Sequence, residues 1–229
     1  MTSVTSPERD AGVLKLVLFD CDGTLVDSAD IIHASMLATF REAGLPEPDK
    51  AATKGIIGLT LDIAIATLLK RAPDAESTRL AARYKEHFIA SRHLPSFKEP
   101  LYDGIGELIE ALARRDDVLI GMVTGKSRRG VERVMETHGF GRHFVTIRTA
   151  DDCPSKPHPA MVLECCAEMG VDPASTLVIG DAVYDMQMAR NAGARAIGVA
   201  WGYHNREGLF ATGAHAVIDR PGELLPLIG

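Results

Sequence analysis

The sequence predicts an α/β fold in which a doubly wound parallel sheet carries an inserted small helical domain. Short apolar runs typical of buried strands alternate with segments of helical periodicity along most of the 229 residues. The first two of these runs lie about a hundred residues apart, whereas a crossover with its helix needs only a few tens. The residues between them contain no convincing strand, so we expect a helical insertion there.

The first strand is expected at residues 13–19, an apolar run typical of a strand buried on both faces. Three helices of the insertion follow, with Ser28 as the N-cap of the first; they are placed at 28–43, 60–70 and 76–92, with a connection at 45–59. A break rich in proline ends the insertion at 95–100. We therefore divide the chain into a core of residues 1–27 and 96–229 and a helical domain of residues 28–95.

The rest of the core alternates strands and helices, which favours a parallel sheet covered on both faces. The strands are expected at 118–123, 144–149, 176–179, 196–199 and 216–218, and the helices at 104–115, 128–138, 158–169, 184–191 and 222–227.

Composition and charge exclude several classes of function. The net charge is −6 without a long basic run, so we expect no nucleic-acid or membrane partner. No apolar stretch approaches the ~18–20 residues that span a bilayer, and residues 1–10 are too polar for a signal peptide. The four cysteines lack disulfide or zinc spacing, as in a reducing compartment. We expect a cytoplasmic protein, and the sequence leaves open whether it is a monomer or a homodimer.

Four short stretches at predicted strand ends or helix starts carry the chemistry. They are Asp20-Cys21-Asp22, Thr124-Gly125-Lys126, Lys156-Pro157-His158-Pro159 and Gly180-Asp181-Ala182-Val183-Tyr184-Asp185. In a parallel sheet all four fall on the carboxyl edge, where open α/β sheets bind ligands. Each stretch alone could be a turn, a solvated lysine or an N-cap, but chance explains their combination poorly.

The combination suits phosphoryl transfer. The carboxylates of Asp20, Asp181 and Asp185 are the hard oxygen ligands that Mg²⁺ prefers. Lys156, Thr124 and the backbone N–H groups near Gly125 suit a phosphoryl dianion. An aspartate can act as the nucleophile and form an aspartyl phosphate. A second aspartate can protonate the leaving alcohol and later activate water.

These motifs resemble those of the haloacid dehalogenase superfamily of phosphohydrolases. The stretch Asp20-Cys21-Asp22-Gly23-Thr24-Leu25 is similar to its first motif, D-x-D-G-T-L, and Thr124, Lys156 and Gly180-Asp181-x-x-x-Asp185 match the second, third and fourth motifs in order. The resemblance covers the whole core. It implies a Rossmann-like sheet of strand order 3-2-1-4-5, a C1-type helical cap, Mg²⁺ dependence and a phospho-aspartate mechanism. The stretches 189–194 and 198–203 are most similar to the phosphoglycolate-phosphatase-like branch.

The resemblance also implies a role for each matching residue. Asp20 is expected to be the nucleophile and a metal ligand, and Asp22 the general acid and base that binds Mg²⁺ through its backbone carbonyl. Thr124 is expected to bind the phosphoryl group, and Lys156 to neutralise charge on it and on Asp20. Asp181 completes the implied metal site, with Asp185 as a direct or water-mediated partner.

The sequence departs from the family pattern at two positions. Gly125 stands where many members carry asparagine, and Ala182 stands where many carry a hydroxyl residue. Outside the motifs, Lys54 and Gly55 lie where C1 caps present a substrate-facing loop, so Lys54 is a candidate for a substrate carboxylate, with a solvated lysine as the equal alternative. Three further basic residues are expected to be solvated: Arg83, Arg92 and His93.

Together these observations predict a Mg²⁺-dependent phosphatase that hydrolyses a small phosphate monoester, with 2-phosphoglycolate as one candidate substrate. A phosphomutase of the same superfamily is the nearest alternative. Related mutases carry a cap histidine twelve residues after the nucleophile, where this sequence has Ile32, and His33 is one residue further on. A dehalogenase, or a non-catalytic module that binds phospho-ligands or a protein, would not need the intact set of acids.

Overall fold

A computed structural model gives the structure of residues 13–94 and 97–229. The expectation about residues 1–10 and the domain boundary at 95/96 lie outside the described residues. The described part contains a parallel sheet of strand order β3-β2-β1-β4-β5-β6. Its strands are β1 (Lys15–Phe19), β2 (Val118–Val123), β3 (Phe144–Arg148), β4 (Thr176–Gly180), β5 (Arg195–Val199) and β6 (Ala216–Ile218). The expected order 3-2-1-4-5 is confirmed, and β6 extends it beyond β5.

Helices cover both faces of the sheet. Successive residues of a strand point to opposite faces, so alternate residues pack against different helices. Val17 and Phe19 of β1 pack in one apolar cluster with α5 (Ile105–Ala113), α6 (Arg128–His138) and α10 (Leu225–Ile228). Leu16 and Leu18 pack in a second cluster with α7 (Ala160–Met169), α8 (Val183–Ala192) and α9 (Arg206–Ala211). The sheet is therefore doubly wound, as the sequence predicts.

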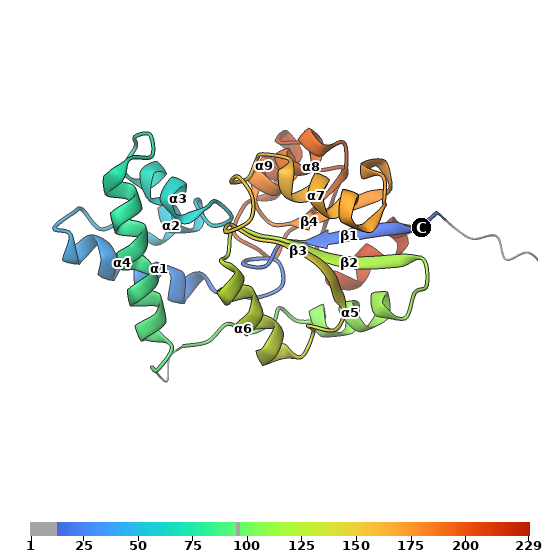
Figure 1. Cartoon of the computed structure of the whole chain (residues 1–229), viewed down its shortest axis with the longest axis horizontal. Coiled ribbons are helices and arrows are strands. Elements are labelled where there is room, and N and C mark those ends of the chain that lie inside the picture. The colour runs from blue at the N-terminus through green and yellow to red at the C-terminus, as the bar shows by residue number, and fades with distance from the viewer. Residues whose placement is uncertain (1–12, 95–96) are drawn as a thin grey trace, which may run out of the picture.

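The first four helices after β1 lie beside the carboxyl edge of the sheet and have a core of their own (Figure 1). They are α1 (Ala29–Glu42), α2 (Lys50–Lys54), α3 (Leu61–Leu68) and α4 (Ala75–Ser91). Met36, Phe40 and Ile65 are buried in this third apolar cluster. We call these helices and the loops between them the cap. Its bounds at residues 28 and 95 stay a prediction.

Two short helices were not expected from the sequence. Residues 45–59, interpreted as a connection, contain α2, and the segment before β6 contains α9. Side-chain caps begin both helices: Asp49 accepts a hydrogen bond from the Ala52 N–H at 2.7 Å, and Asn205 accepts one from the Gly208 N–H at 2.7 Å. Helices this short show too few turns for apolar periodicity, so only their caps could have predicted them.

The two chain segments that join cap and core lie side by side. The N–H of Asp27 donates to the carbonyl of Pro100 at 2.8 Å, and that of Tyr102 donates to Leu25 at 3.1 Å. Val26 and Leu101 form an isolated antiparallel bridge. The cap is thus attached to the core by two adjacent, hydrogen-bonded chain segments. Among the described helices, none is long and apolar enough to span a membrane.

Candidate active site

The structure brings the predicted motif residues together at the carboxyl edge of the sheet. Asp20 directly follows β1, Thr124 follows β2 and Asp181 follows β4. Lys156 reaches the same edge from the loop between β3 and α7, and Asp185 from the first turn of α8. These five side chains are buried, none more than 1% exposed. A parallel sheet places the ends of neighbouring strands at one edge, which is why residues 165 positions apart meet here.

Lys156 holds two of the acids. Its Nζ donates to Oδ1 of Asp20 at 2.7 Å and to Oδ1 of Asp185 at 2.6 Å. Burial alone would lower the pKa of Lys156, but the charges of Asp185 and Asp20 outweigh it and raise the pKa. Lys156 is therefore a fixed positive charge at the centre of the site.

Three carboxylates form a cluster that fits a divalent cation. Asp20, Asp181 and Asp185 each offer an oxygen, and these oxygens lie within 4.8 Å of one another. Oδ2 of Asp20 is buried and has no hydrogen-bond partner among the described residues. A buried carboxylate oxygen is costly without a donor or a metal. The donor set, all hard oxygens, is the one that Mg²⁺ prefers.

Burial and mutual repulsion shift the titration of these acids. Burial, opposed in part by Lys156 and reinforced by Asp185, raises the pKa of Asp20 to about 6. Burial and the charges of Asp20 and Asp185 raise the pKa of Asp181 well above its ordinary value. Both shifts have the sign expected of acids crowded around too little positive charge.

Two glycines hold Asp181 in place. A Cβ on Gly23, where φ is +89°, would lie 2.4 Å from Oδ2 of Asp181, and a Cβ on Gly202 would lie 2.1 Å from the Asp181 Cβ. The backbone approaches this closely only because neither residue has a side chain. Asp181 accepts hydrogen bonds from the Tyr203 N–H at 2.8 Å and from Oγ1 of Thr24 at 3.3 Å. The Asp181 carboxylate is thereby held close to those of Asp20 and Asp185.

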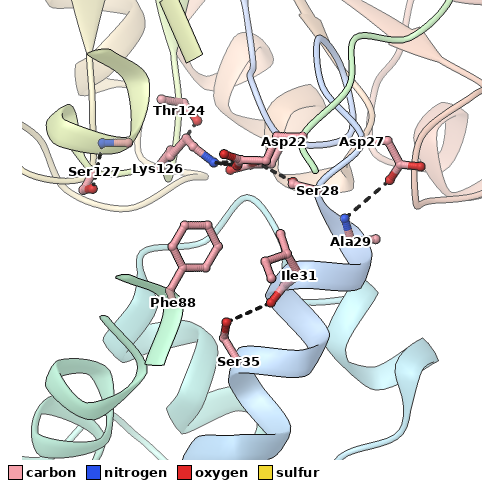
Figure 2. Close-up of polar contacts among 12 residues, drawn as sticks. Asp22, Asp27, Ser28, Ala29, Ile31, Ser35, Phe88, Thr124, Lys126 and Ser127 are labelled. Atoms are coloured by element: carbon pink, nitrogen blue, oxygen red, sulfur yellow. Dashed lines mark hydrogen bonds and ion pairs between the residues drawn. The ribbon is translucent and has the colours of Figure 1, made fainter. Parts of the chain in front are cut away.

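Asp22 lies apart from the acidic cluster and faces the cap. Its Oδ1 accepts hydrogen bonds from Oγ of Ser28 at 2.6 Å and from Nζ of Lys126 at 2.8 Å (Figure 2). Lys126 also donates to Glu99 at 2.8 Å. Asp20 and Asp22 thus have different surroundings, although only one residue separates them. Cys21 between them is buried in the apolar cluster around α5 and α6, as expected of a small core residue.

Sequence reasoning missed Lys126 and Glu99 as members of the site. Lys126 belongs to the Thr124-Gly125-Lys126 stretch, but its 104-residue separation from Asp22 left no local signal for their contact. Glu99 lies in the segment interpreted only as a linker. Their pairing depends on how the linker packs against the end of β2, which is a tertiary property.

The cap is docked on the core above these residues. The Thr60 N–H donates to Oγ of Ser155 at 2.9 Å, and the Tyr184 hydroxyl donates to the Gly55 carbonyl at 2.9 Å. A Cβ on Gly125 would lie 2.5 Å from the Gly58 carbonyl oxygen. An asparagine at 125, as in many family members, would therefore collide with the cap in this arrangement. The glycine permits the close approach of the cap loop.

A cavity of about 660 Å³ lies between cap and core. Asp22, Gly125 and Lys126 line it from the core. Lys54 does not line it; instead its ammonium lies 5.4 Å from the centre of the Tyr203 ring. Gly55 faces a second hollow, of about 340 Å³, with Tyr203 and His204. The proposed contact of Lys54 with a substrate carboxylate stays a prediction, without support from the cavity.

The chain matches the family model described as haloacid dehalogenase-like hydrolase over residues 17–199. An N-acetylmuramic acid 6-phosphate phosphatase of Pseudomonas aeruginosa is 33% identical over 94% of this chain and 95% of its own. A phosphoglycolate phosphatase of Vibrio vulnificus is 30% identical over 94% of this chain and 96% of its own.

A solved structure shares the fold. A haloacid dehalogenase-like family hydrolase from Streptococcus pneumoniae superposes with a TM-score of 0.79 at 24% identity, over 94% of this chain and 99% of that one. The matched segment of the family model contains Asp20, Thr124, Lys156 and the acids at 181 and 185, which the structure gathers around one point. The chain belongs to the haloacid dehalogenase-like hydrolases.

Proposed function

We propose that the protein is a cytoplasmic, Mg²⁺-dependent phosphatase that hydrolyses a small phosphate monoester through an aspartyl phosphate on Asp20. One observation carries the proposal. Asp20 is buried at the end of β1, with one oxygen held by Lys156 and the other without a partner among the described residues. A nucleophile in this position has a fixed cation beside it and one oxygen that no described residue engages.

In the first step an oxygen of Asp20 attacks phosphorus, and the bond from phosphorus to the alcohol oxygen breaks. Asp22 gives its proton to the departing oxygen. A water molecule then attacks phosphorus, passes a proton to Asp22, and displaces the Asp20 carboxylate, which releases inorganic phosphate. The hydrogen bonds from Ser28 and Lys126 hold the Asp22 side chain on the cap side, where the alcohol would leave.

The remaining polar groups of the site would bind the phosphoryl group. Thr124 lies buried beside Asp20 at the neighbouring strand end, and Gly125 follows it, half-buried under the cap loop. Lys156 neutralises negative charge between Asp20 and the incoming phosphate. Positioning and charge neutralisation are the main demands of phosphoryl transfer.

The acids Asp20, Asp181 and Asp185 would hold Mg²⁺, with the backbone carbonyl of Asp22 as the ligand implied by the family resemblance. When bound, the ion would offset the negative charge of the phosphoryl oxygens and of the acids. The free oxygen of Asp20 and the approach of the three carboxylates support this assignment.

The cap would close over the bound substrate and exclude water. The paired segments around Val26 and Leu101 are the proposed hinge, since they join cap and core at one place. Contacts of Thr60 with Ser155 and of Tyr184 with Gly55 would break on opening.

The relatives suggest more than one substrate. One is named for N-acetylmuramic acid 6-phosphate and another for phosphoglycolate, and both compounds are phosphate monoesters that carry a carboxylate. The phosphomutase alternative gains no support from the cap: Ile32 is apolar, and Nδ1 of His33 lies 2.9 Å from Oγ1 of Thr53.

The test is phosphate release from a panel of both named esters, sugar phosphates, nucleoside monophosphates and pyrophosphate, with Mg²⁺ and then with EDTA. We expect release from at least one monoester with Mg²⁺, little with EDTA, and none above background from Asp20→Asn. Formation of a sugar bisphosphate without free phosphate would support a mutase. An unchanged rate for Asp20→Asn would remove Asp20 as the nucleophile.

A further inference from the structure

The cavity between cap and core is far larger than a two-carbon ester needs. Its volume of about 660 Å³ lies within the ~300–1,000 Å³ range of pockets that hold drug-sized ligands. Most of its cap side is apolar, formed by Ile32, Met36, Ile57, Tyr84, Phe88 and Ile89. Apolar walls favour a ligand with a substantial carbon body, whose burial contributes to binding.

Cationic side chains from both domains also line this cavity. Lys85 and Arg92 come from the cap, and Arg129 and Lys126 from the core. Lys126 is engaged by Asp22 and Glu99.

Arg92 differs from the other cations of the cavity, because two of its donor nitrogens, Nε and Nη1, are buried without a partner among the described residues. Arg92 as a whole is half-buried, so the expectation that it is solvated is wrong for these two nitrogens only. Burial, together with Arg133 and Arg129, lowers its pKa. Buried guanidinium donors without acceptors are costly, so the site is suited to an anionic group.

Three acids line the cavity, and none forms an ion pair with Arg92 among the described residues: Asp22 pairs with Lys126, and the others are Asp62 and Asp151. Asp151 instead accepts a hydrogen bond from the Arg128 N–H at 2.9 Å. The acceptor for Arg92 would therefore come from the ligand.

Phe88 lies close both to Arg92 and to a lysine at the reacting end of the site. The Arg92 guanidinium lies 5.5 Å from the centre of the Phe88 ring, and Nζ of Lys126 lies 5.7 Å from the same centre. Lys126 in turn contacts Asp22, the proposed proton donor to the leaving alcohol. Figure 2 shows Phe88 on the cap, facing the Lys126–Asp22 pair. The leaving-group end of the site and Arg92 thus approach the same aromatic ring.

We propose that Arg92 is a specificity-determining residue, which selects phosphate monoesters whose alcohol carries a ring-sized, partly apolar body and a carboxylate at its far end. This inference rests on the proposed phosphatase function. The phosphate lies at Asp20, the body against Phe88, and the carboxylate on the fork of donors of Arg92, which matches carboxylate geometry. A two-carbon ester would leave most of the cavity unfilled.

The test compares two matched esters, phenyl phosphate and 4-(carboxymethyl)phenyl phosphate, by their kcat/KM values. For the wild type we expect a preference of about tenfold or more for the carboxylated ester, as one charge-assisted hydrogen bond provides. In Arg92→Gln that preference should fall to within about twofold, chiefly through KM. Arg92→Lys should keep part of it, because the charge stays while the planar fork is lost.

Arg79→Gln is the matched control. Arg79 lies on α4, which ends just before Arg92, but is exposed, and it contacts only Glu76 among the ion pairs of the described residues. It should retain the wild-type preference. The phenyl phosphate rate of Arg92→Gln also reports that this variant is folded.

Two results would overturn the inference. Equal use of the two esters by the wild type, or an equal loss on both in Arg92→Gln, would mean that Arg92 does not select a carboxylate. If the wild type released phosphate from neither these esters nor the metabolite panel, the proposed function itself would fail. Release without the predicted preference would refute only the role of Arg92.

Discussion

Replacing Lys156 with methionine should destabilise the protein strongly when no metal is present. The lysine side chain is 0% exposed, and its two partners, Asp20 and Asp185, are 1% and 0% exposed. Solvent therefore cannot screen the charges that are left behind. Removing one partner of a buried ion pair costs about 3–5 kcal/mol, and here one lysine serves two acids. Since domains are stable by roughly 5–15 kcal/mol, the loss should be conspicuous.

The assay is urea unfolding at pH 7 with EDTA, repeated with excess Mg²⁺. Lys156→Met should unfold at a much lower urea concentration than the wild type in EDTA. Mg²⁺ should raise its midpoint more than that of the wild type, because the ion places positive charge among the same carboxylates. Activity should stay lost in either condition.

Lys50→Met provides the comparison. Lys50 also pairs with an aspartate, Asp30, but the two side chains are 53% and 86% exposed, so its loss should barely move the midpoint. The role of Lys156 as the buried counter-charge would be refuted if both variants unfolded alike in EDTA, or if Mg²⁺ stabilised Lys156→Met and the wild type equally.

Three further predictions test other parts of the structure. Gly202→Ala places a Cβ 2.1 Å from the Asp181 Cβ, so Mg²⁺ affinity measured by calorimetry should fall about 10–100-fold; unchanged affinity would contradict the metal assignment. Lys126→Met leaves Asp22 and Glu99 without their shared lysine, and kcat should fall more than the KM rises; a change in KM alone would mean that Lys126 does not position Asp22. Ile65→Ala, in the apolar cluster of the cap, should cost about 2–5 kcal/mol in denaturant unfolding; a smaller loss would indicate a loosely packed cap.

The sheet and the acidic cluster were predictable because both follow from local patterns. Apolar runs at 118–123 and 144–149 show strands directly, and a parallel sheet then brings the residues after them to one edge. The positions of Asp20 and Asp181 follow from that rule alone. The contact of Asp185 with Lys156 follows less directly, since it needs the first turn of α8 to begin just after β4.

The cap side of the site was less predictable, because it depends on how two domains dock. Arg92 looks like an ordinary basic residue at a helix end, and only the tertiary structure shows that two of its donor nitrogens are buried. Gly125 appears in the sequence only as a departure from the family pattern. In the structure a Cβ at this position would lie 2.5 Å from the Gly58 carbonyl oxygen, so the glycine allows the cap loop to approach, and no local pattern encodes that contact. The helices α2 and α9 were not predicted because they are too short to show apolar periodicity; each offers only a side-chain cap and little more than one turn.

The most direct test of the account is to trap phosphate on Asp20. The protein would be mixed with its best substrate from the panel and Mg²⁺, quenched in acid, reduced with borohydride, and digested for peptide mass spectrometry. An acyl phosphate is reduced to the alcohol, so we predict homoserine at position 20 in a substrate-dependent fraction, in the wild type and, formed more slowly, in Asp22→Asn. Rapid phosphate release with aspartate intact at position 20 in both proteins would contradict the central claim.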